Sequence, residues 1–367
     1  MRSRSFALVL VPMLAACTGG NGGQAGPAPS GARIGAVSST KPSPTPTPAP
    51  TPPPLSLAGV FGANKPDLSI LDQSKLRVLI ATGDVIPARE VNYQVLLHKD
   101  FLYPWRQTAD YLKTGDLLFV NLESPLLKSC PVTRSGFKFC GDARSIAGFD
   151  YAGVNVANLA NNHSTNYGVA GTSETIALLA KHGIGVSGNG LSEVRNIRGV
   201  KFGFIGFNGV GNHIDRAELK REIDLIRPGC DVLVVAFHWG KEYELLPTVG
   251  AGIAPDNPRE IGHLAIDLGA DLVIGNHPHW IQPVEVYRYR LIAYAHGNFI
   301  FDQMWSEETR QGVVGRYTFY GTQLIRVDYK PLKIDGYAQP HWLDETIGEG
   351  KVIIDRMAKG SDQLAAR

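Results

Sequence analysis

Histidine, carboxylate and asparagine side chains recur in this 367-residue chain directly after short apolar runs. The densest group is His277-Pro278-His279, which follows Gly275-Asn276 and the apolar residues 270–274. Two imidazoles two residues apart, at the end of a buried strand, can bind two metal ions, or one ion and a substrate. Sites of the same kind follow other apolar runs, at Asp84, Glu123, Asn162-His163 and His238.

A carboxylate, neutral imidazoles and amide oxygens together form the kind of ligand set that a dinuclear metal site needs. Such a site supplies a hydroxide nucleophile near neutral pH and stabilises charge on a leaving oxygen. Each residue alone has a structural alternative: a turn or helix cap for Asp84, a solvated loop for Glu123, a core position for His238. Their shared position at strand ends favours the metal site.

Short apolar runs alternate with helical periodicity along the chain, which predicts an α/β domain with largely buried strands. Ligands bind beyond the carboxyl ends of strands in such sheets, and the candidate residues lie at those ends. Strands are expected at 76–81, 116–120, 153–159, 200–207, 231–237, 271–274 and 291–295, and helices at 170–182, 214–226 and 258–268. Antiparallel strands are expected at 284–289, 323–328 and 332–337, and a short closing helix would begin at 352–357.

The N-terminus resembles the signal of a bacterial lipoprotein. Arg2 and Arg4 precede an apolar stretch, residues 6–16, that is too short to span a bilayer and ends Leu14-Ala15-Ala16-Cys17. We expect residues 1–16 to be removed and Cys17 to be lipidated, which would anchor the protein to the extracytoplasmic face of the cell membrane. An ordinary cleaved signal with an incidental cysteine is the alternative.

Composition sets the limits of the remaining chain. Residues 17–74 are rich in Gly and Pro and predict a disordered linker, stiffened by the Pro-rich part from 41 to 54. The folded domain is expected at 75–367. A net charge of +2 and a pI near 8.3 give no electrostatic indication of nucleic-acid binding.

Three cysteines lie in the predicted domain. Cys130 and Cys140 flank a short segment that contains Gly136, and we expect them to pair in an oxidising compartment. Cys230 precedes a predicted apolar strand and is expected to be a buried, unpaired thiol.

These motifs, in this order, resemble the CapA family of bacterial capsule synthesis proteins, also called poly-γ-glutamate capsule proteins. The resemblance runs from about residue 76 to the C-terminal segment. The matching pieces are Gly83-Asp84-Val85 with Arg89, Asn121-Leu122-Glu123-Ser124-Pro125, Ala160-Asn161-Asn162-His163 with Gly168, His238-Trp239-Gly240-Lys241-Glu242-Tyr243, Gly275-Asn276-His277-Pro278-His279 with Gln282-Pro283, and Gly297-Asn298-Phe299-Ile300-Phe301-Asp302-Gln303.

The resemblance implies a four-layer αββα sandwich like that of calcineurin-like metallophosphatases, with two divalent metal ions. The residue types suit Mn, Fe or Zn. Glu123 would bridge the ions. By the same resemblance, one ion would be held by Asn162, His238 and His277, and the other by Asp84 and His279.

The resemblance also places His163 as a donor to the substrate or leaving group, with Glu242 beside it. Arg89 is a further candidate, with Lys241 and Arg310, for binding a carboxylate or phosphate. Three positions depart from the family pattern. Ile86 stands where metallophosphatases usually have His, Asn166 replaces an Asp, and His296 replaces a Leu and could add a ligand or donor at the mouth.

The family resemblance implies a role in making, exporting or attaching an anionic polymer such as poly-γ-glutamate, together with membrane synthase subunits. Two classes of function stay open. The site chemistry suits a metal-dependent hydrolase that cleaves a phosphoester or an amide. Ile86 instead favours a non-catalytic subunit of an envelope synthase complex, which would bind the polymer or a partner, because one ion would lack a ligand.

Overall fold

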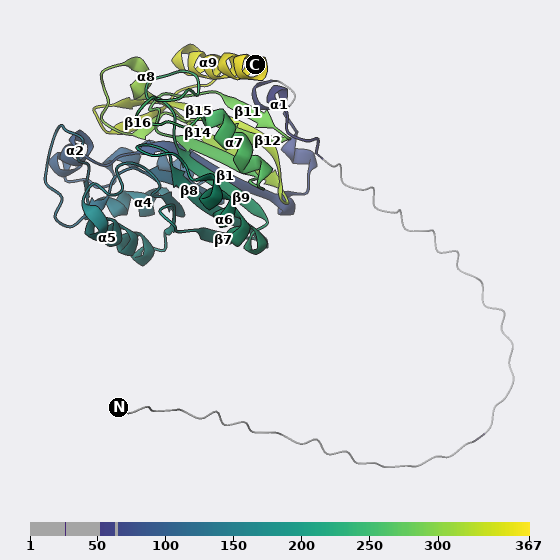
Figure 1. Ribbon diagram of the computed structural model, residues 1–367, viewed down its shortest axis with the longest axis horizontal. Helices are drawn as coiled ribbons and strands as arrows, with labels where there is room; N and C mark the ends of the chain where they lie inside the picture. The colour runs from purple at the N-terminus through teal and green to yellow at the C-terminus, as the bar shows by residue number, and fades with distance from the viewer. Residues whose placement is uncertain (1–25, 27–51, 63–64) are drawn as a thin grey trace. The chain divides into compact units, whose positions relative to one another are not determined.

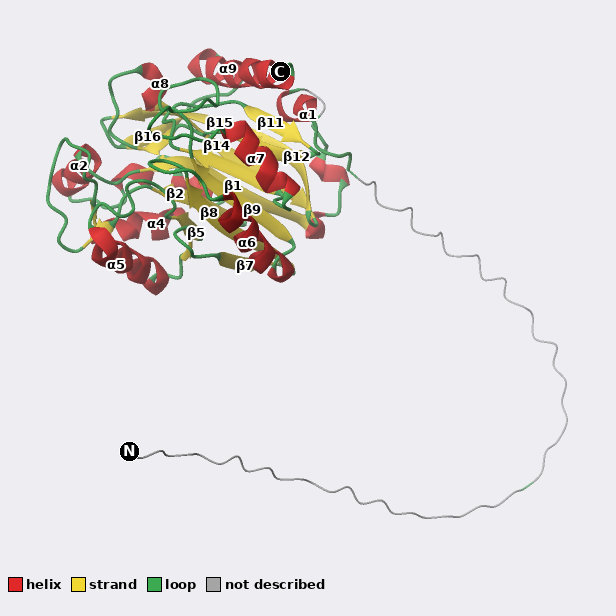
Figure 2. Cartoon of the chain, viewed as in Figure 1, coloured by secondary structure: helices red, strands yellow, loops and turns green. Residues whose placement is uncertain are grey.

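The computed structural model describes residue 26, residues 52–62 and residues 65–367. In the part from residue 52 onward, two large β-sheets stack face to face, and helices cover the outer face of each (Figures 1 and 2). This arrangement confirms the αββα sandwich expected from the sequence. The signal segment, Cys17 and most of the linker lie outside the described residues, so those predictions stay untested.

The first sheet is arranged around β1 (Leu76–Val85), which pairs in parallel with β2 (Leu117–Leu122) and antiparallel with β14 (Gln311–Tyr320). Almost every residue of β1 is buried, as is typical of a strand covered on both faces. The sheet also contains β5 (Val156–Asn158), β6 (Gly185–Ser187), β13 (Asn298–Ile300), β15 (Gln323–Asp335) and β16 (Gln339–Trp342). Its outer face is covered by α2 (Glu90–His98), α3 (Ala109–Leu112), α4 (Ile146–Ala152) and α5 (Gly168–Lys181).

The second sheet has the strand order β11-β12-β10-β9-β8-β7. Its parallel centre consists of β8 (Val200–Asn208), β9 (Val232–His238), β10 (Leu272–Asn276) and β12 (Arg290–Ala293). The antiparallel edges are β7 (Glu193–Ile197) and β11 (Val284–Tyr287), as expected for β11. Helices α6 (Arg216–Ile226) and α7 (Pro258–Asp267) pack on its outer face.

The core between the sheets joins apolar side chains from both. Phe119 of β2 stacks on Phe204 of β8, with ring centroids 5.5 Å apart. Helix α9 (Gly348–Ala365) packs against β11 and β15, one strand from each sheet, and buries Ile353 and Met357 in the same core. The C-terminal helix therefore helps to hold the two sheets together, and it is longer than the short helix expected.

Residues 55–61, which the prediction placed in the linker, are part of the folded domain. Helix α1 (Leu57–Phe61) is capped by Ser56, whose side chain accepts from the Gly59 amide. Leu55 and Val60 are buried in the core between the sheets, and Phe61 stacks on Tyr329 of β15. These few apolar residues attach the end of a Pro-rich segment to the domain.

The antiparallel segment after residue 310 also differs from the prediction. Strand β14 was not expected, and β15 is one strand where the sequence indicated two, at 323–328 and 332–337. Pro331, which lacks a backbone N–H, lies between the two predicted segments. Pro331 lies where pairing with β16 begins, opposite Val313 of β14, so its missing donor interrupts little of the ladder.

Cys130 and Cys140 form a disulfide, with their Cα atoms 5.8 Å apart, while Cys230 is a buried free thiol. Across residues 52–62 and 65–367, no helix has the length and apolarity needed to cross a membrane.

Candidate metal centre

The predicted ligands meet where the carboxyl ends of strands from both sheets come together. Asp84 is the second-last residue of β1, and Glu123 directly follows β2. His238 ends β9, and His277 and His279 follow β10. All five residues are at most 4% exposed. Parallel pairing aligns these ends, as shown by the registers Asp84 to Asn121 and Asn276 to His238.

Two groups of side chains offer ligand atoms to a common point. In one, atoms of Asp84, Glu123 and His238 all lie within 4.8 Å of one another. In the other, the same holds for Glu123, His277 and His279. Glu123 belongs to both groups, which is the position that a bridging carboxylate would occupy.

The turn after β10 aims both of its imidazoles into the centre. His277 has φ 98° and His279 has φ 58°, a region that non-glycine residues rarely adopt. Gly275 permits this path, because a Cβ there would lie 2.0 Å from the Tyr294 carbonyl oxygen and 2.4 Å from Trp239 Nε1. Such backbone strain is typical of functional sites.

Several polar atoms of the centre are buried without a hydrogen-bond partner among the described residues. They are both carboxylate oxygens of Glu123, both ring nitrogens of His277 and Nδ1 of His238. Buried polar atoms are nearly always satisfied in folded proteins. A carboxylate and imidazoles that converge in this way fit a divalent transition-metal ion, which would supply the missing partner.

Asn162 reaches the centre from the loop after β5. Its Oδ1 lies 2.9 Å from Nε2 of His238, and that nitrogen lies 3.3 Å from Oε1 of Glu123. The amide oxygen, the imidazole and the carboxylate are thus neighbours.

Asp84 and His279 form a second pair, with Oδ2 and Nδ1 3.1 Å apart. Two asparagines that we did not assign to the site support them: Asn121 Nδ2 donates to Asp84 Oδ1 at 2.9 Å, and Asn298 Oδ1 lies 3.0 Å from His279 Nδ1. Both lie inside the motifs that match the family, Asn121 two residues before Glu123 and Asn298 directly after Gly297. Their positions in these motifs could have identified them as site residues.

Burial sets the protonation of the other imidazoles. It lowers the pKa of His238 to about 3 and that of His163 to about 4, and it lowers the pKa of His277 well below its usual value. These rings are therefore neutral at pH 7, which is the form that binds metal ions.

The pKa values of the two carboxylates, Glu123 and Asp84, are shifted in opposite directions. Burial and the Asp84 charge raise the pKa of Glu123 well above its usual value. Burial opposes the charges on Asp84 and His279, yet their mutual hydrogen bond lowers the pKa of Asp84 and raises that of His279 to about 9. Asp84 and His279 are thus placed as an ion pair, whose proton a metal ion would have to displace.

His163 lies half-buried beside the centre. Its Nδ1 is 2.9 Å from Asn166 Oδ1, and its ring stacks on Phe139 with centroids 4.0 Å apart. Because an amide oxygen only accepts, Nδ1 carries the proton in the neutral ring and Nε2 keeps its lone pair. Asn166, noted as a departure from the family pattern, is therefore the residue that sets this tautomer.

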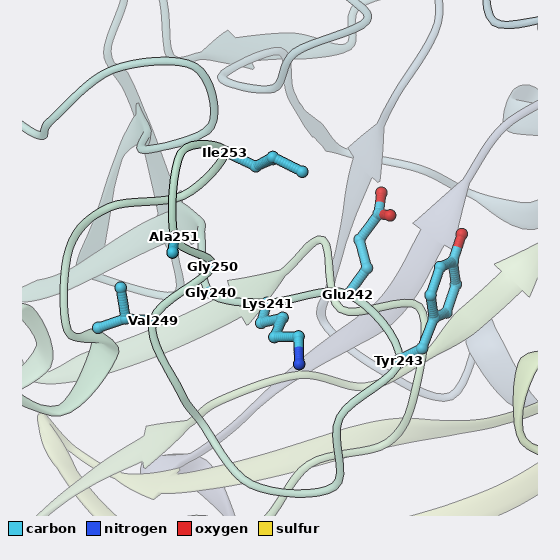
Figure 3. Close-up of a pocket in the computed structure, with 8 residues that line it drawn as sticks. All are labelled: Gly240, Lys241, Glu242, Tyr243, Val249, Gly250, Ala251 and Ile253. Carbon is cyan, nitrogen blue, oxygen red and sulfur yellow. The ribbon is translucent and has the colours of Figure 1, made fainter.

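Glu242 and Tyr243 line a pocket of about 420 Å³, closed on the other side by Val249, Ala251 and Ile253 (Figure 3). The Glu242 and Tyr243 side chains point the same way in this view, and Lys241 points elsewhere. Burial dominates the pKa values of Glu123 and His238, and the Glu242 charge is a smaller influence that favours the protonated form of each. The Tyr243 amide donates to the Pro278 carbonyl, between the two histidines, at 2.9 Å.

Ile86 and His296 are both buried and are not placed as ligands. Ile86 is fully buried with Ala88, Phe139 and Phe301 and offers no ligand. His296 is not at the mouth, where we had expected it. Its Nε2 is 2.7 Å from the Tyr317 hydroxyl of β14, an unpredicted strand, and the ring is fully buried behind the centre.

The candidate cations for binding substrate are engaged by carboxylates of the protein. Arg89 pairs with Asp302, and Lys241 pairs with Glu244. Arg310 pairs with Asp335 at 2.8 Å. In this structure none of the three presents an unpaired charge to the centre.

The fold and the site together define the class of this protein. It is an α/β sandwich protein with a candidate metal centre, which consists of buried carboxylates and imidazoles at the strand ends. The family model "Bacterial capsule synthesis protein PGA_cap" matches residues 78–303. The chain therefore belongs to this family, which confirms the resemblance read from its motifs.

The names of two relatives refer to capsule or PGA biosynthesis. "Capsule biosynthesis protein CapA" of Bacillus anthracis is 28% identical over 289 residues, which cover 70% of this chain and 68% of the relative. "PGA biosynthesis protein CapA" of Bacillus subtilis (strain 168) is 30% identical over 228 residues, or 56% of this chain and 58% of the relative. The chain thus spans about three fifths of the second relative.

Two solved structures share a weak likeness. A hypothetical protein from Thermus thermophilus has a TM-score of 0.46 at 17% identity, covering 70% of this chain and 99% of that one. A novel phosphatase from Mycoplasma pneumoniae has a TM-score of 0.45 at 14% identity, covering 70% and 94%.

Proposed function

We propose that this protein is a lipid-anchored, extracytoplasmic hydrolase that uses divalent metal ions and acts on an anionic polymer of the poly-γ-glutamate type, in its synthesis, export or attachment. Membership of the capsule synthesis family and the relatives' names support the polymer. One observation carries the chemistry: both carboxylate oxygens of Glu123 and both ring nitrogens of His277 are buried without a partner among the described residues.

The residues that would hold one or two ions of Mn, Fe or Zn are Asp84, Glu123, Asn162, His238, His277 and His279. A bound ion of this kind lowers the pKa of water and polarises the bond to be cleaved. The chain's own residues would bind the substrate beside Glu242, exclude bulk water through their burial, and move protons.

His163 is suited to the proton transfer. Its Nε2 lone pair is free of the Asn166 contact, so the neutral ring accepts a proton there and can return it to a leaving group. The half-buried ring is accessible to a substrate, whereas the carboxylate and imidazole ligands are buried.

A second function is favoured by Ile86. Its burial in an apolar cluster leaves the Asp84 side of the centre with one ligand fewer than a metallophosphatase has. A protein with one incomplete site would bind the polymer, or a membrane synthase subunit, without cleaving anything.

A hydrolysis assay on the metal-loaded protein separates the two functions. The probes are poly-γ-glutamate and bis(p-nitrophenyl) phosphate, which test an amide and a phosphodiester. His163→Gln should keep its metal and lose about 100-fold in turnover, the usual effect of a lost acid or base. His182→Gln is the control, because His182 is held by Asp150 at the surface. Metal-loaded wild type that cleaves neither probe would support the binding subunit.

A further inference from the structure

A loop closed by the Cys130–Cys140 disulfide borders the candidate metal centre. Residues 131–138 of this disulfide loop are all exposed, whereas Phe139 and Cys140 are 3% and 4% exposed. The loop thus inserts a single aromatic side chain into the protein, directly before the half-cystine that fixes the end of the loop.

Phe139 makes two contacts that determine how His163 is held. Its ring stacks on the imidazole, with centroids 4.0 Å apart and planes 23° from parallel. Its backbone N–H donates to Asn166 Oδ1 at 2.7 Å, and this same oxygen accepts from His163 Nδ1 at 2.9 Å. One loop residue therefore fixes the ring face and also orients the amide that sets its tautomer.

Arg89 contacts the disulfide loop and holds it against the rest of the domain. Its guanidinium lies over the rings of Phe139 and Phe301, 4.8 and 4.9 Å from their centroids, and donates to the Gly136 carbonyl at 3.1 Å. Asp302 holds the guanidinium in place. The φ of 50° at Arg89 is a strained conformation for a non-glycine residue, which indicates that surrounding contacts hold it there.

We propose that the disulfide loop is a working part of the site: Phe139 and Asn166 are positioning residues for His163, and the Cys130–Cys140 bond keeps them in place. The inference rests on the proposed function in that His163 would transfer protons. Arg89 then acts through the loop as a brace, without meeting the substrate.

The physical reason is the entropy of the loop. Without the disulfide, a segment whose residues 131–138 are exposed has little burial to keep it ordered, so Phe139 would leave the imidazole. The His163 side chain would then keep only its hydrogen bond to Asn166, and its ring could rotate. A misplacement of about 1 Å at a reacting group can lower a rate about 100-fold.

The positioning can be measured without activity, by NMR of the full chain labelled at histidine Cε1. His163→Gln identifies the His163 signal. Stacking on Phe139 should shift the ring proton upfield, and this shift should persist in Phe139→Tyr and in the control Phe137→Leu, which alters an 83% exposed residue of the same loop. Phe139→Leu, the double variant Cys130→Ser/Cys140→Ser, and reduced wild type should lose the shift. An unchanged signal in those three would overturn the proposal.

Turnover of bis(p-nitrophenyl) phosphate gives the second readout. Phe139→Leu should lower kcat roughly 10- to 100-fold at unchanged metal content, with Phe139→Tyr and Phe137→Leu near wild type. A kcat for Phe139→Leu within twofold of wild type would also overturn the proposal. If wild type cleaves no probe, the hydrolase proposal fails, and the NMR signal alone decides whether the loop positions His163.

Discussion

Replacing Glu123 by Gln should have opposite effects on the metal-free and the metal-bound protein. Glu123 is fully buried, neither of its oxygens has a hydrogen-bond partner among the described residues, and the nearby Asp84 charge raises its pKa together with burial. In the metal-free protein at neutral pH, this group must either ionise in an unfavourable environment or take up a proton. The isosteric amide stays neutral at every pH, so it removes the part of that cost that comes from burying a charge.

The magnitude follows from the difference between a buried charged group and a buried neutral one, which we take to be of the same order as the cost of an unsatisfied polar group, about 1–3 kcal/mol. Glu123→Gln should therefore raise the unfolding free energy in a chelator by about 1–3 kcal/mol. The carboxyl pKa is higher in the folded state, so wild type loses stability as the pH rises from the ordinary carboxyl range to that raised pKa. The difference between the two proteins should grow over the same range.

With metal present, wild type should have the higher unfolding free energy and Glu123→Gln the lower. Ligand binding stabilises the native state by about 2.7 kcal/mol at 100 times Kd, and Glu123→Gln should lose this gain because it removes the shared ligand. Urea unfolding in chelator and in excess Mn²⁺ measures both effects.

Glu90→Gln is the matched control for this comparison. Glu90 is also a buried carboxylate, but it is paired with Arg134 at 2.7 Å. The control should be destabilised in chelator and should keep its response to Mn²⁺. If Glu123→Gln behaved like Glu90→Gln under both conditions, the reasoning about Glu123 would be refuted.

Three further predictions concern other parts of the molecule. Removing the disulfide with Cys130→Ser/Cys140→Ser should lower the unfolding free energy by about 2–3 kcal/mol, from the entropy of a short loop; urea unfolding that shows no change would contradict this. In chelator, His279 should contribute stability that is complete below its ordinary pKa of 6.5 and is lost as the pH rises through about 9, and Asp84→Asn should flatten this part of the pH–stability curve. Wild type should fractionate with membranes and Cys17→Ser should be released or stay unprocessed, since lipidation at this cysteine would provide the anchor; wild type recovered wholly in the soluble fraction would reject the anchor.

The parts of the site that lie at the ends of parallel strands could be predicted from the sequence. Asp84, Glu123, His238 and His277 each follow or end an apolar run, and parallel pairing brings such ends to one edge. The helices at α5, α6 and α7 were also found nearly to the residue, because their apolar periodicity is strong.

Features that depend on antiparallel strands and on tertiary contacts could not be predicted in the same way. Nothing local shows that β14 pairs with β1, so His296 was placed at the mouth when Tyr317 holds it in the core. The stacking of Phe139 on His163 joins residues from a disulfide loop and a strand-end turn. The burial of Leu55 likewise required the finished sheet as a surface.

Elemental analysis of the purified full chain tests the central claim most directly. Wild type at neutral pH should contain at least one tightly held Mn, Fe or Zn ion per chain. A second ion should be weaker, because Ile86 leaves the Asp84 side short of a ligand. Glu123→Gln should contain less than a tenth of the wild-type metal, and Glu90→Gln should contain the full amount. Wild type that takes up no transition metal, while it remains folded, would contradict the account.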